Sequence, residues 1–156
     1  MSAIHELKSM TPEREAAWLG ILQAHAEVTR ALDLTLSDRH DLSLSAYEVL
    51  SRLARAEGGA QRMSDLAGCS PLSLSRVSRV IDALQERGLV SRSPCGRDSR
   101  VVYAAVTPAG MALAQQAQET FSEVVEGRFL GRLSCDEIGQ LGSMLARLVA
   151  PATPDA

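Results

Sequence analysis

The sequence has few aromatic residues, few cysteines and no long hydrophobic run. Aromatic side chains make up 3% of the 156 residues, whereas hydrophobic residues reach 46% and charged residues 22%. These proportions are those of a globular chain of about one domain, and they exclude collagen-like and wholly disordered classes. The longest apolar run, residues 101–106, is far shorter than a membrane-spanning helix. Because no basic region followed by an apolar stretch opens the chain, we expect a soluble, cytoplasmic protein without a secretory signal.

The three cysteines do not form a pattern that holds a metal ion or a disulfide framework. Cys69, Cys95 and Cys135 are odd in number and far apart, and no CxxC pair occurs. All three histidines precede the first cysteine. This spacing argues against a structural zinc site and against disulfides. We therefore expect reduced thiols, no metal site and no cofactor.

Motifs of the common enzyme classes are also missing. The chain contains no Gly-x-Ser-x-Gly, no phosphate-binding loop, no His-Glu-x-x-His and no dinucleotide fingerprint. The sequence therefore offers no catalytic residue, and we do not expect an enzyme.

The charge of the chain, in contrast, is unevenly distributed. The formal net charge is −3 overall. Residues 1–51 carry four basic and eight acidic groups, and residues 101–156 carry three arginines and six acidic groups. Between them, residues 52–100 carry nine arginines against five acidic groups, a net charge of +4. A positive segment between two acidic ones predicts a localised anion-binding surface.

Helix signals recur along the chain. Thr11-Pro12, Ser70-Pro71 and Thr107-Pro108 each place a hydroxyl side chain before a proline, which is typical of a helix start. Ser45–Glu48 and Ser134–Glu137 fit capping boxes. These signals predict helices that begin near residues 12, 45, 70, 108 and 135, with a short strand near residues 62–63 and a short helix over residues 64–68.

The middle of the chain has the order of a winged helix-turn-helix. On the helix expected over residues 70–87, Leu74, Val77, Ile81 and Leu84 form one apolar stripe. Two β-rich runs, residues 89–93 and 101–106, then flank a polar hairpin loop over residues 94–100. We predict a mainly α protein with a small β-wing, in which a winged helix-turn-helix over residues 41–106 is flanked by helices.

The face of this helix opposite the stripe carries side chains that suit DNA. At 100° per residue, Ser75, Arg76 and Arg79 lie roughly opposite the stripe, and Ser78 lies at its margin. Arginine can donate two hydrogen bonds to guanine, and serine can bond bases or phosphates. We therefore predict that this helix enters the major groove.

The hairpin loop carries a second set of candidate DNA contacts. Arg97 and Arg100 are expected to reach the neighbouring minor groove or the phosphates. Asp98 would be repelled by DNA, so its expected role is to accept a hydrogen bond from Arg100 and fix its direction.

Four segments occur in the order and spacing of a known family: Leu44–Tyr47, Ser78–Val90, Asp98–Arg100 and Val106–Gly110. Through them the chain resembles the MarR family (multiple-antibiotic-resistance regulators) of bacterial transcription factors. Ser78 departs from the threonine that the family often has there, but it keeps the hydroxyl group.

The resemblance implies a homodimer that binds a roughly palindromic double-stranded operator. Residues 1–40 and 107–150 would form its helical dimerisation region, and residues 151–156 a disordered tail. Similar proteins often release DNA when a small, frequently aromatic anion binds between the dimerisation helices and the DNA-binding lobe. We therefore expect a repressor, with Trp18, His25 and Tyr47 as candidate effector contacts.

Two other functions stay open. The basic face could meet an acidic protein, which would make the chain a winged-helix adaptor. The peroxide-sensing branch of the family uses a cysteine near the start of the first long helix, but residues 1–68 contain none. Cys95, near Arg92 and Arg97 in the expected wing, is the remaining candidate for thiol-based redox regulation.

Overall fold

The structure is a computed structural model that describes residues 10–68, 73–95 and 98–149; the side chains of residues 95–100 are not described. The order of the elements confirms the predicted winged helix-turn-helix. In chain order they are α1 (Pro12–His40), α2 (Leu44–Arg55), η1 (Glu57–Gly59), β1 (Ala60–Arg62), α3 (Met63–Gly68), α4 (Leu74–Glu86), β2 (Val90–Cys95), β3 (Asp98–Val106), α5 (Pro108–Arg128), η2 (Leu130–Arg132) and α6 (Cys135–Val149).

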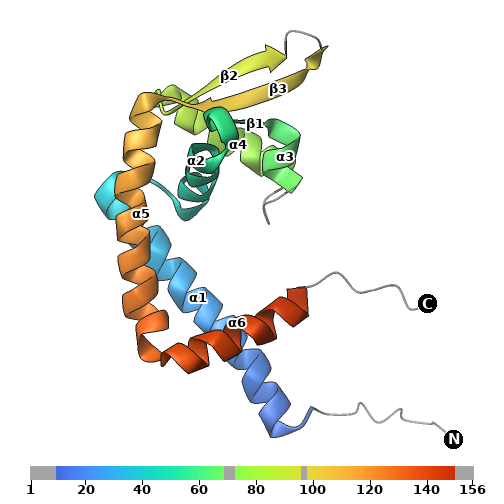
Figure 1. Ribbon diagram of the computed structural model, residues 1–156, viewed down its shortest axis with the longest axis vertical. Helices are drawn as coiled ribbons and strands as arrows, with labels where there is room; N and C mark the ends of the chain where they lie inside the picture. Colours follow the sequence, from blue (N-terminus) through green and yellow to red (C-terminus); the bar gives the residue numbers. More distant parts are fainter. Residues whose placement is uncertain (1–9, 69–72, 96–97, 150–156) are drawn as a thin grey trace, which may run out of the picture.

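The elements gather at two ends of an elongated molecule (Figure 1). One end is a lobe of α2, α3, α4 and an antiparallel sheet with the strand order β1-β3-β2. Helix α5 leaves this lobe and runs to the other end, where α6 follows it, and α1 packs along α5. Within the described residues, no helix is both long and apolar enough to cross a membrane.

The hydrophobic core lies in the lobe and at its junction with α1 and α5. The largest fully buried side chains are Leu36, Leu42, Leu50, Leu53, Leu66, Val77, Ile81, Leu84 and Val90. Full burial of such a side chain contributes about 1.5–3 kcal/mol each, so these residues fix the lobe as one unit. Gly110 permits a close contact here, because a Cβ at this position would lie 2.1 Å from the carbonyl oxygen of Leu89.

The first half of α1 and the whole of α6 contain no buried residue. Residues 12–27 are all exposed, and the buried residues of α1 are confined to its last third. Eight exposed apolar side chains lie on these two segments: Trp18, Leu19, Ile21, Leu22, Met144, Leu145, Leu148 and Val149. An apolar surface of this extent is typical of a face that another protein surface covers.

Two predicted caps differ from the structure. Helix α2 begins at Leu44, near the predicted start, but its cap is Ser43 and not Ser45, because the Ser43 hydroxyl accepts a hydrogen bond from the backbone N–H of Ala46 at 3.1 Å. Ser70-Pro71, the predicted start of α4, lies outside the described residues; the helix begins at Leu74, because Ser73 has an extended backbone and caps it through the N–H of Arg76. Leu74 therefore occupies the first turn and is 54% exposed, so it does not extend the buried stripe.

The wing strands are longer than predicted. Strand β2 continues to Cys95, and β3 begins at Asp98 and pairs with β2 from there. The backbone of Asp98 and Arg100 therefore belongs to a strand and not to the hairpin loop. Longer pairing is possible because the polar residues here add ladder hydrogen bonds without needing a buried face.

Of the other predicted caps, Thr107 and Ser134 form capping hydrogen bonds, whereas Thr11 precedes α1 without a side-chain capping bond. The Thr107 hydroxyl accepts from the N–H of Gly110 at 3.0 Å, and Gly88 ends α4 with a φ of 70°. Before α6, the N–H of Ser134 donates to the Glu137 carboxylate at 2.8 Å, and the N–H of Glu137 donates back at 3.3 Å. The backbone and hydroxyl hydrogen bonds from Ser134 lower the pKa of the Glu137 carboxyl.

Candidate nucleic-acid interface

Helix α4 buries one face and leaves the opposite face in solvent. Val77, Ile81 and Leu84 are buried, whereas Ser75, Arg76 and Arg79 are all exposed. The Arg76 guanidinium lies 3.4 Å from the Ser45 hydroxyl of α2. Within the part of the chain that the structure describes, Arg79 makes no hydrogen bond or ion pair. The exposed face of α4 therefore carries Ser75, Arg76 with one hydrogen bond to α2, and Arg79 without a partner among the described residues.

Ser78 does not belong to this free group. Its side chain is half-buried, and its hydroxyl accepts a hydrogen bond from Arg92 Nη2 at 3.2 Å. The same nitrogen donates to the Ser78 carbonyl oxygen at 3.0 Å. Ser78 thus joins α4 to strand β2, and its hydroxyl lies at the boundary between the helix and the wing.

Arg92 is the central residue of this connection. Besides the two bonds to Ser78, its Nη1 pairs with the carboxylate of Asp82 on α4. Sequence reasoning considered Arg92 only as a neighbour of Cys95. The signal that identifies it is strand alternation, because Arg92 lies two positions after the buried Val90 and so shares its face.

The wing carries the other predicted DNA contacts. Arg97 lies outside the described residues, as do the side chains of Cys95, Asp98 and Arg100. The structure therefore places the backbone of Asp98 and Arg100 at the start of β3 and leaves their expected contact untested.

An additional cation lies on the neighbouring strand of the sheet. Arg62 of β1 is exposed; its Nε donates to the Tyr103 hydroxyl at 3.0 Å, and its guanidinium lies 5.8 Å from the centre of that ring. Sequence reasoning missed Arg62 as a possible phosphate contact, since nothing local in the sequence pairs β1 with β3.

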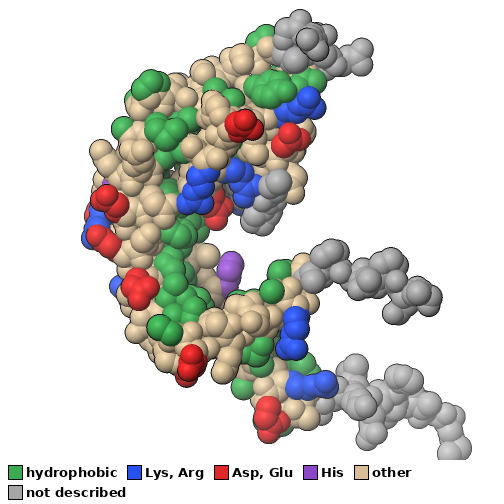
Figure 2. Space-filling model, viewed as in Figure 1, with side chains coloured by type: hydrophobic (Ala, Val, Ile, Leu, Met, Phe, Trp, Pro, Cys, Tyr) green, Lys and Arg blue, Asp and Glu red, His purple; other side chains and the backbone are tan. Residues whose placement is uncertain are grey.

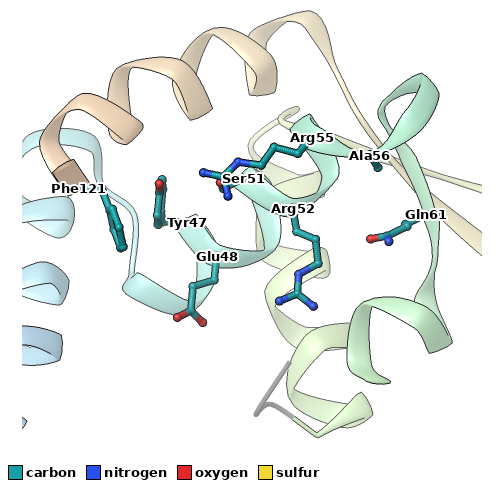
Figure 3. A pocket seen from close by; sticks show the side chains of 8 residues that line it. All are labelled: Tyr47, Glu48, Ser51, Arg52, Arg55, Ala56, Gln61 and Phe121. Atoms are coloured by element: carbon teal, nitrogen blue, oxygen red, sulfur yellow. The ribbon is translucent and has the colours of Figure 1, made fainter. Parts of the chain in front are cut away.

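The surface between the lobe and the other end of the molecule is hollowed, and basic side chains lie on the lobe's side of the hollow (Figure 2). A pocket of about 450 Å³ lies on this lobe, between α2, β1 and α5. Its lining residues are Tyr47, Glu48, Ser51, Arg52, Arg55, Ala56, Gln61 and Phe121 (Figure 3). Two arginines and one glutamate line it, so its net charge is positive.

Tyr47 is the predicted effector contact that lines this pocket. It stacks on Phe121 with ring centres 5.0 Å apart, and its hydroxyl donates to Gln118 Oε1 at 2.8 Å. Burial raises the pKa of the Tyr47 hydroxyl above its ordinary value. Trp18 and His25 do not line the pocket; both are exposed on the first half of α1.

Two buried polar atoms of the pocket have no partner in the described structure. They are the guanidinium nitrogen Nη1 of Arg52 and the amide oxygen Oε1 of Gln61. Figure 3 shows both side chains extending into the same space, from α2 and β1. A buried donor or acceptor without a partner costs about 1–3 kcal/mol, and the described residues supply a partner to neither atom. Among the described residues, no group of three His, Cys, Asp or Glu side chains is placed to hold a metal ion.

Comparisons of the sequence and of the fold with known proteins agree with a winged, DNA-binding lobe. Residues 40–101 match the sequence profile of the MarR family. The transcriptional repressor IacR of Pseudomonas putida is 27% identical over 128 residues, which cover 82% of this chain and 73% of that protein.

Two solved structures from Streptomyces coelicolor are also similar. AbsC, a MarR family transcriptional regulator, is 28% identical with a TM-score of 0.84 over 90% of this chain and 95% of its own. Sco3205, a MarR family regulator solved in complex with DNA, shares the fold with a TM-score of 0.87 at 23% identity, over 94% and 96% of the two chains. With the winged lobe, the exposed face of α4 and the matched profile, the chain is similar to the MarR family of DNA-binding transcriptional regulators, in sequence over residues 40–101 and in fold over most of its length.

Proposed function

We propose that this protein is a homodimeric repressor that binds a palindromic operator in the cytoplasm and releases it when a small anion binds. The observation that carries the proposal is the exposed face of α4 next to the wing. On this face Arg79 makes no hydrogen bond or ion pair among the described residues, and Arg76 makes one hydrogen bond, to Ser45. In this arrangement Ser75, Arg76 and Arg79 contact the major groove, and Ser78 lies at the edge of the contact. Arg97 and Arg100 contact the minor groove or the phosphates, with Asp98 orienting Arg100.

The dimer is supported by the exposed apolar faces of α1 and α6. We assign residues 1–40 and 107–150 to dimerisation and residues 41–106 to DNA binding. With 29 residues, α1 is about 44 Å long, and its first half has no core within its own chain. A two-fold dimer presents two copies of α4 about 34–36 Å apart, one turn of the duplex, which requires a roughly palindromic operator.

The DNA-binding function is tested by selecting duplexes from a random pool with the purified protein and measuring affinity by fluorescence anisotropy. We expect a palindrome to emerge. With about six to ten phosphate contacts in the dimer, its affinity should fall about 10³–10⁵-fold between 50 and 200 mM salt. An adaptor would select no sequence and would bind no duplex at 50 mM salt, and that result would overturn the proposal.

The effector site is supported by the pocket around Tyr47. An acid that also carries an N–H or O–H group would satisfy both unpartnered atoms, because its carboxylate accepts from Arg52 and its donor meets Gln61. The Tyr47 and Phe121 rings, which stack on each other, provide an apolar wall for an aromatic ligand. To release DNA, such a ligand needs a differential affinity of about 1–3 kcal/mol between the two states.

A further inference from the structure

Arg87 connects the recognition helix directly to the end of the longest helix. It follows α4 as its C-terminal cap residue, and its Nη1 donates to the carbonyl oxygen of Asp41 at 2.5 Å. Its Nη2 donates to the carbonyl oxygen of His40 at 3.3 Å and lies 3.7 Å from the Asp41 carboxylate. Residues 40 and 41 end α1, so one side chain of the DNA-binding lobe holds two carbonyl groups of the helix assigned to dimerisation.

The chemistry of this contact is specific to a guanidinium group. The last carbonyl groups of a helix have no partner within the helix, and its C-terminal end carries partial negative charge. Asp41 turns the chain sharply here, with a φ of 52°, which exposes its carbonyl oxygen to Arg87. A forked cation can bond both oxygens at once, whereas a lysine can hold them only as a point charge.

The same end of α1 is also fixed to α5. The His40 ring nitrogen Nε2 lies 2.8 Å from the buried Thr120 hydroxyl, and Arg39 forms an ion pair with Glu123 at 2.8 Å. Leu36, one turn earlier, is fully buried. The end of α1 is therefore a firm support, and a residue that is bonded to it takes its position from the helices assigned to dimerisation.

The position of α4 relative to this support sets where its DNA-reading residues lie. Helix α4 has 13 residues and is about 20 Å long. A rotation of the whole lobe by about 10° around the Arg87 contact would move the far end of α4 by about 3.4 Å, which equals the rise of one base pair. A small change at Arg87 would therefore shift the preferred distance between two half-sites.

We propose that Arg87 is a positioning residue that sets the half-site spacing the dimer accepts. The inference rests on the proposed function, since it requires a dimer with two DNA-bound copies of α4. Arg87 acts through α4 and needs no contact with DNA. Its removal should relax the selection for spacing, because each lobe, with α4 packed in its core, gains freedom to rotate against the end of α1.

The test uses the palindrome that the wild-type protein selects, together with four derivatives whose half-sites are moved closer or farther apart by one or two base pairs. Affinities of the wild type, Arg87→Ala, Arg87→Lys and the control Gln85→Ala are measured by fluorescence anisotropy. We expect the wild type and Gln85→Ala to lose at least about tenfold in affinity per base pair moved. For Arg87→Ala the loss should shrink to about threefold or less, and Arg87→Lys should lie between.

The ratio of the affinities for duplexes with different half-site spacing distinguishes this role from a general contribution to the stability of the fold. If Arg87 only stabilised the fold, its substitution would weaken binding to all five duplexes by the same factor, and this result would overturn the inference. Arg87→Lys, which keeps the charge and the stem, provides the same comparison if Arg87→Ala does not fold. A wild type that selects no palindrome would instead overturn the proposed function, and the inference with it.

Discussion

At the residue scale, Arg79 and Arg76 differ in how firmly the protein holds them. Arg76 reaches Ser45 of α2, whereas Arg79 has no partner among the described residues. A side chain that the fold leaves unengaged on a groove-facing helix is free to adopt the geometry that a base requires.

Arg79→Ala should therefore weaken operator binding by about 1–3 kcal/mol per contact if it reads a base, and relax the preference at that base pair. The measurement is an anisotropy titration with the selected palindrome and with single-base variants of it. Arg128→Ala serves as control, because Arg128 is an exposed arginine at the end of α5, away from the lobe. Equal affinities of the two variants would remove Arg79 from the interface.

Arg52 illustrates the opposite case, a polar group buried without a partner. Arg52→Met keeps the apolar stem and removes the unpartnered donor, so the free energy of unfolding in urea should stay unchanged or rise by up to about 1 kcal/mol. The same variant should lose the response to aromatic acids.

Thermal-shift measurements without ligand and with a panel of aromatic acids check both the stability of Arg52→Met and its response to these acids. At 100 times its Kd a ligand stabilises the wild type by about 2.7 kcal/mol, and this stabilisation should disappear in Arg52→Met. A variant that is clearly less stable without ligand, or that still responds to the acids, would contradict the assignment of the pocket.

The sequence predicts which residues of α4 are exposed, but it does not show contacts between segments that are distant in the chain. The position of Ser75, Arg76 and Arg79 follows from helical periodicity alone. Arg52 and Arg87 could not be assigned in this way, because their importance depends on β1 and on the end of α1. Trp18 and His25 stay predicted effector contacts, but they do not line the pocket with Tyr47, since a position on α1 does not by itself bring a side chain to α2 and β1.

At the scale of the elements, α4 and the wing are coupled through one arginine. Arg92 bonds the Ser78 backbone and hydroxyl and pairs with Asp82, and its side chain is 27% exposed. Charge-assisted hydrogen bonds of this kind contribute about 1.5–3 kcal/mol when they are buried and less when water reaches them.

Arg92→Met should therefore lower the free energy of unfolding by about 1–2 kcal/mol and weaken operator binding more than this loss of stability explains. Chemical denaturation measures the free energy of unfolding, and fluorescence anisotropy on the same samples measures operator affinity. Arg55→Met is a suitable control, since the side-chain hydrogen bond of Arg55 goes to Gln118 of α5 and not to α4. If operator affinity in Arg92→Met stays at the wild-type value, the wing and α4 act independently.

The helices could be predicted where a capping motif and the apolar periodicity indicate the same boundary. Thr107-Pro108 and Ser134–Glu137 mark their helices correctly because the capping bonds are made within three residues. The sequence does not fix the start of α4, because Ser70-Pro71 and Ser73 are both plausible caps and only the extended backbone of Ser73 identifies it as the cap. For the same reason periodicity includes Leu74 in the apolar stripe, since it does not show where the first turn begins.

At the scale of the whole molecule, the exposed apolar faces of α1 and α6 explain why the fold extends beyond its lobe. These helices bury little in one chain and would bury much more against a second copy. The family resemblance implies a dimer, but only the exposure of each helix shows which faces remain uncovered.

Leu145→Asp should shift the protein to monomer at micromolar concentration, because it places a charge within the apolar face of α6. Size-exclusion chromatography with light scattering measures the mass directly. Ser143→Asp is the matched control, since Ser143 is exposed and lies on the opposite side of the same helix. A dimeric Leu145→Asp variant would show that α6 does not form the interface.

The most direct test of the account is the number of chains on one operator. Sedimentation velocity of a labelled duplex carrying the selected palindrome, titrated with protein at 50 mM salt, measures this number. Two copies of α4 that are held one duplex turn apart predict saturation at two chains per duplex, with no stable complex of one chain. Saturation at a single chain, or free duplex throughout the titration, would contradict the account.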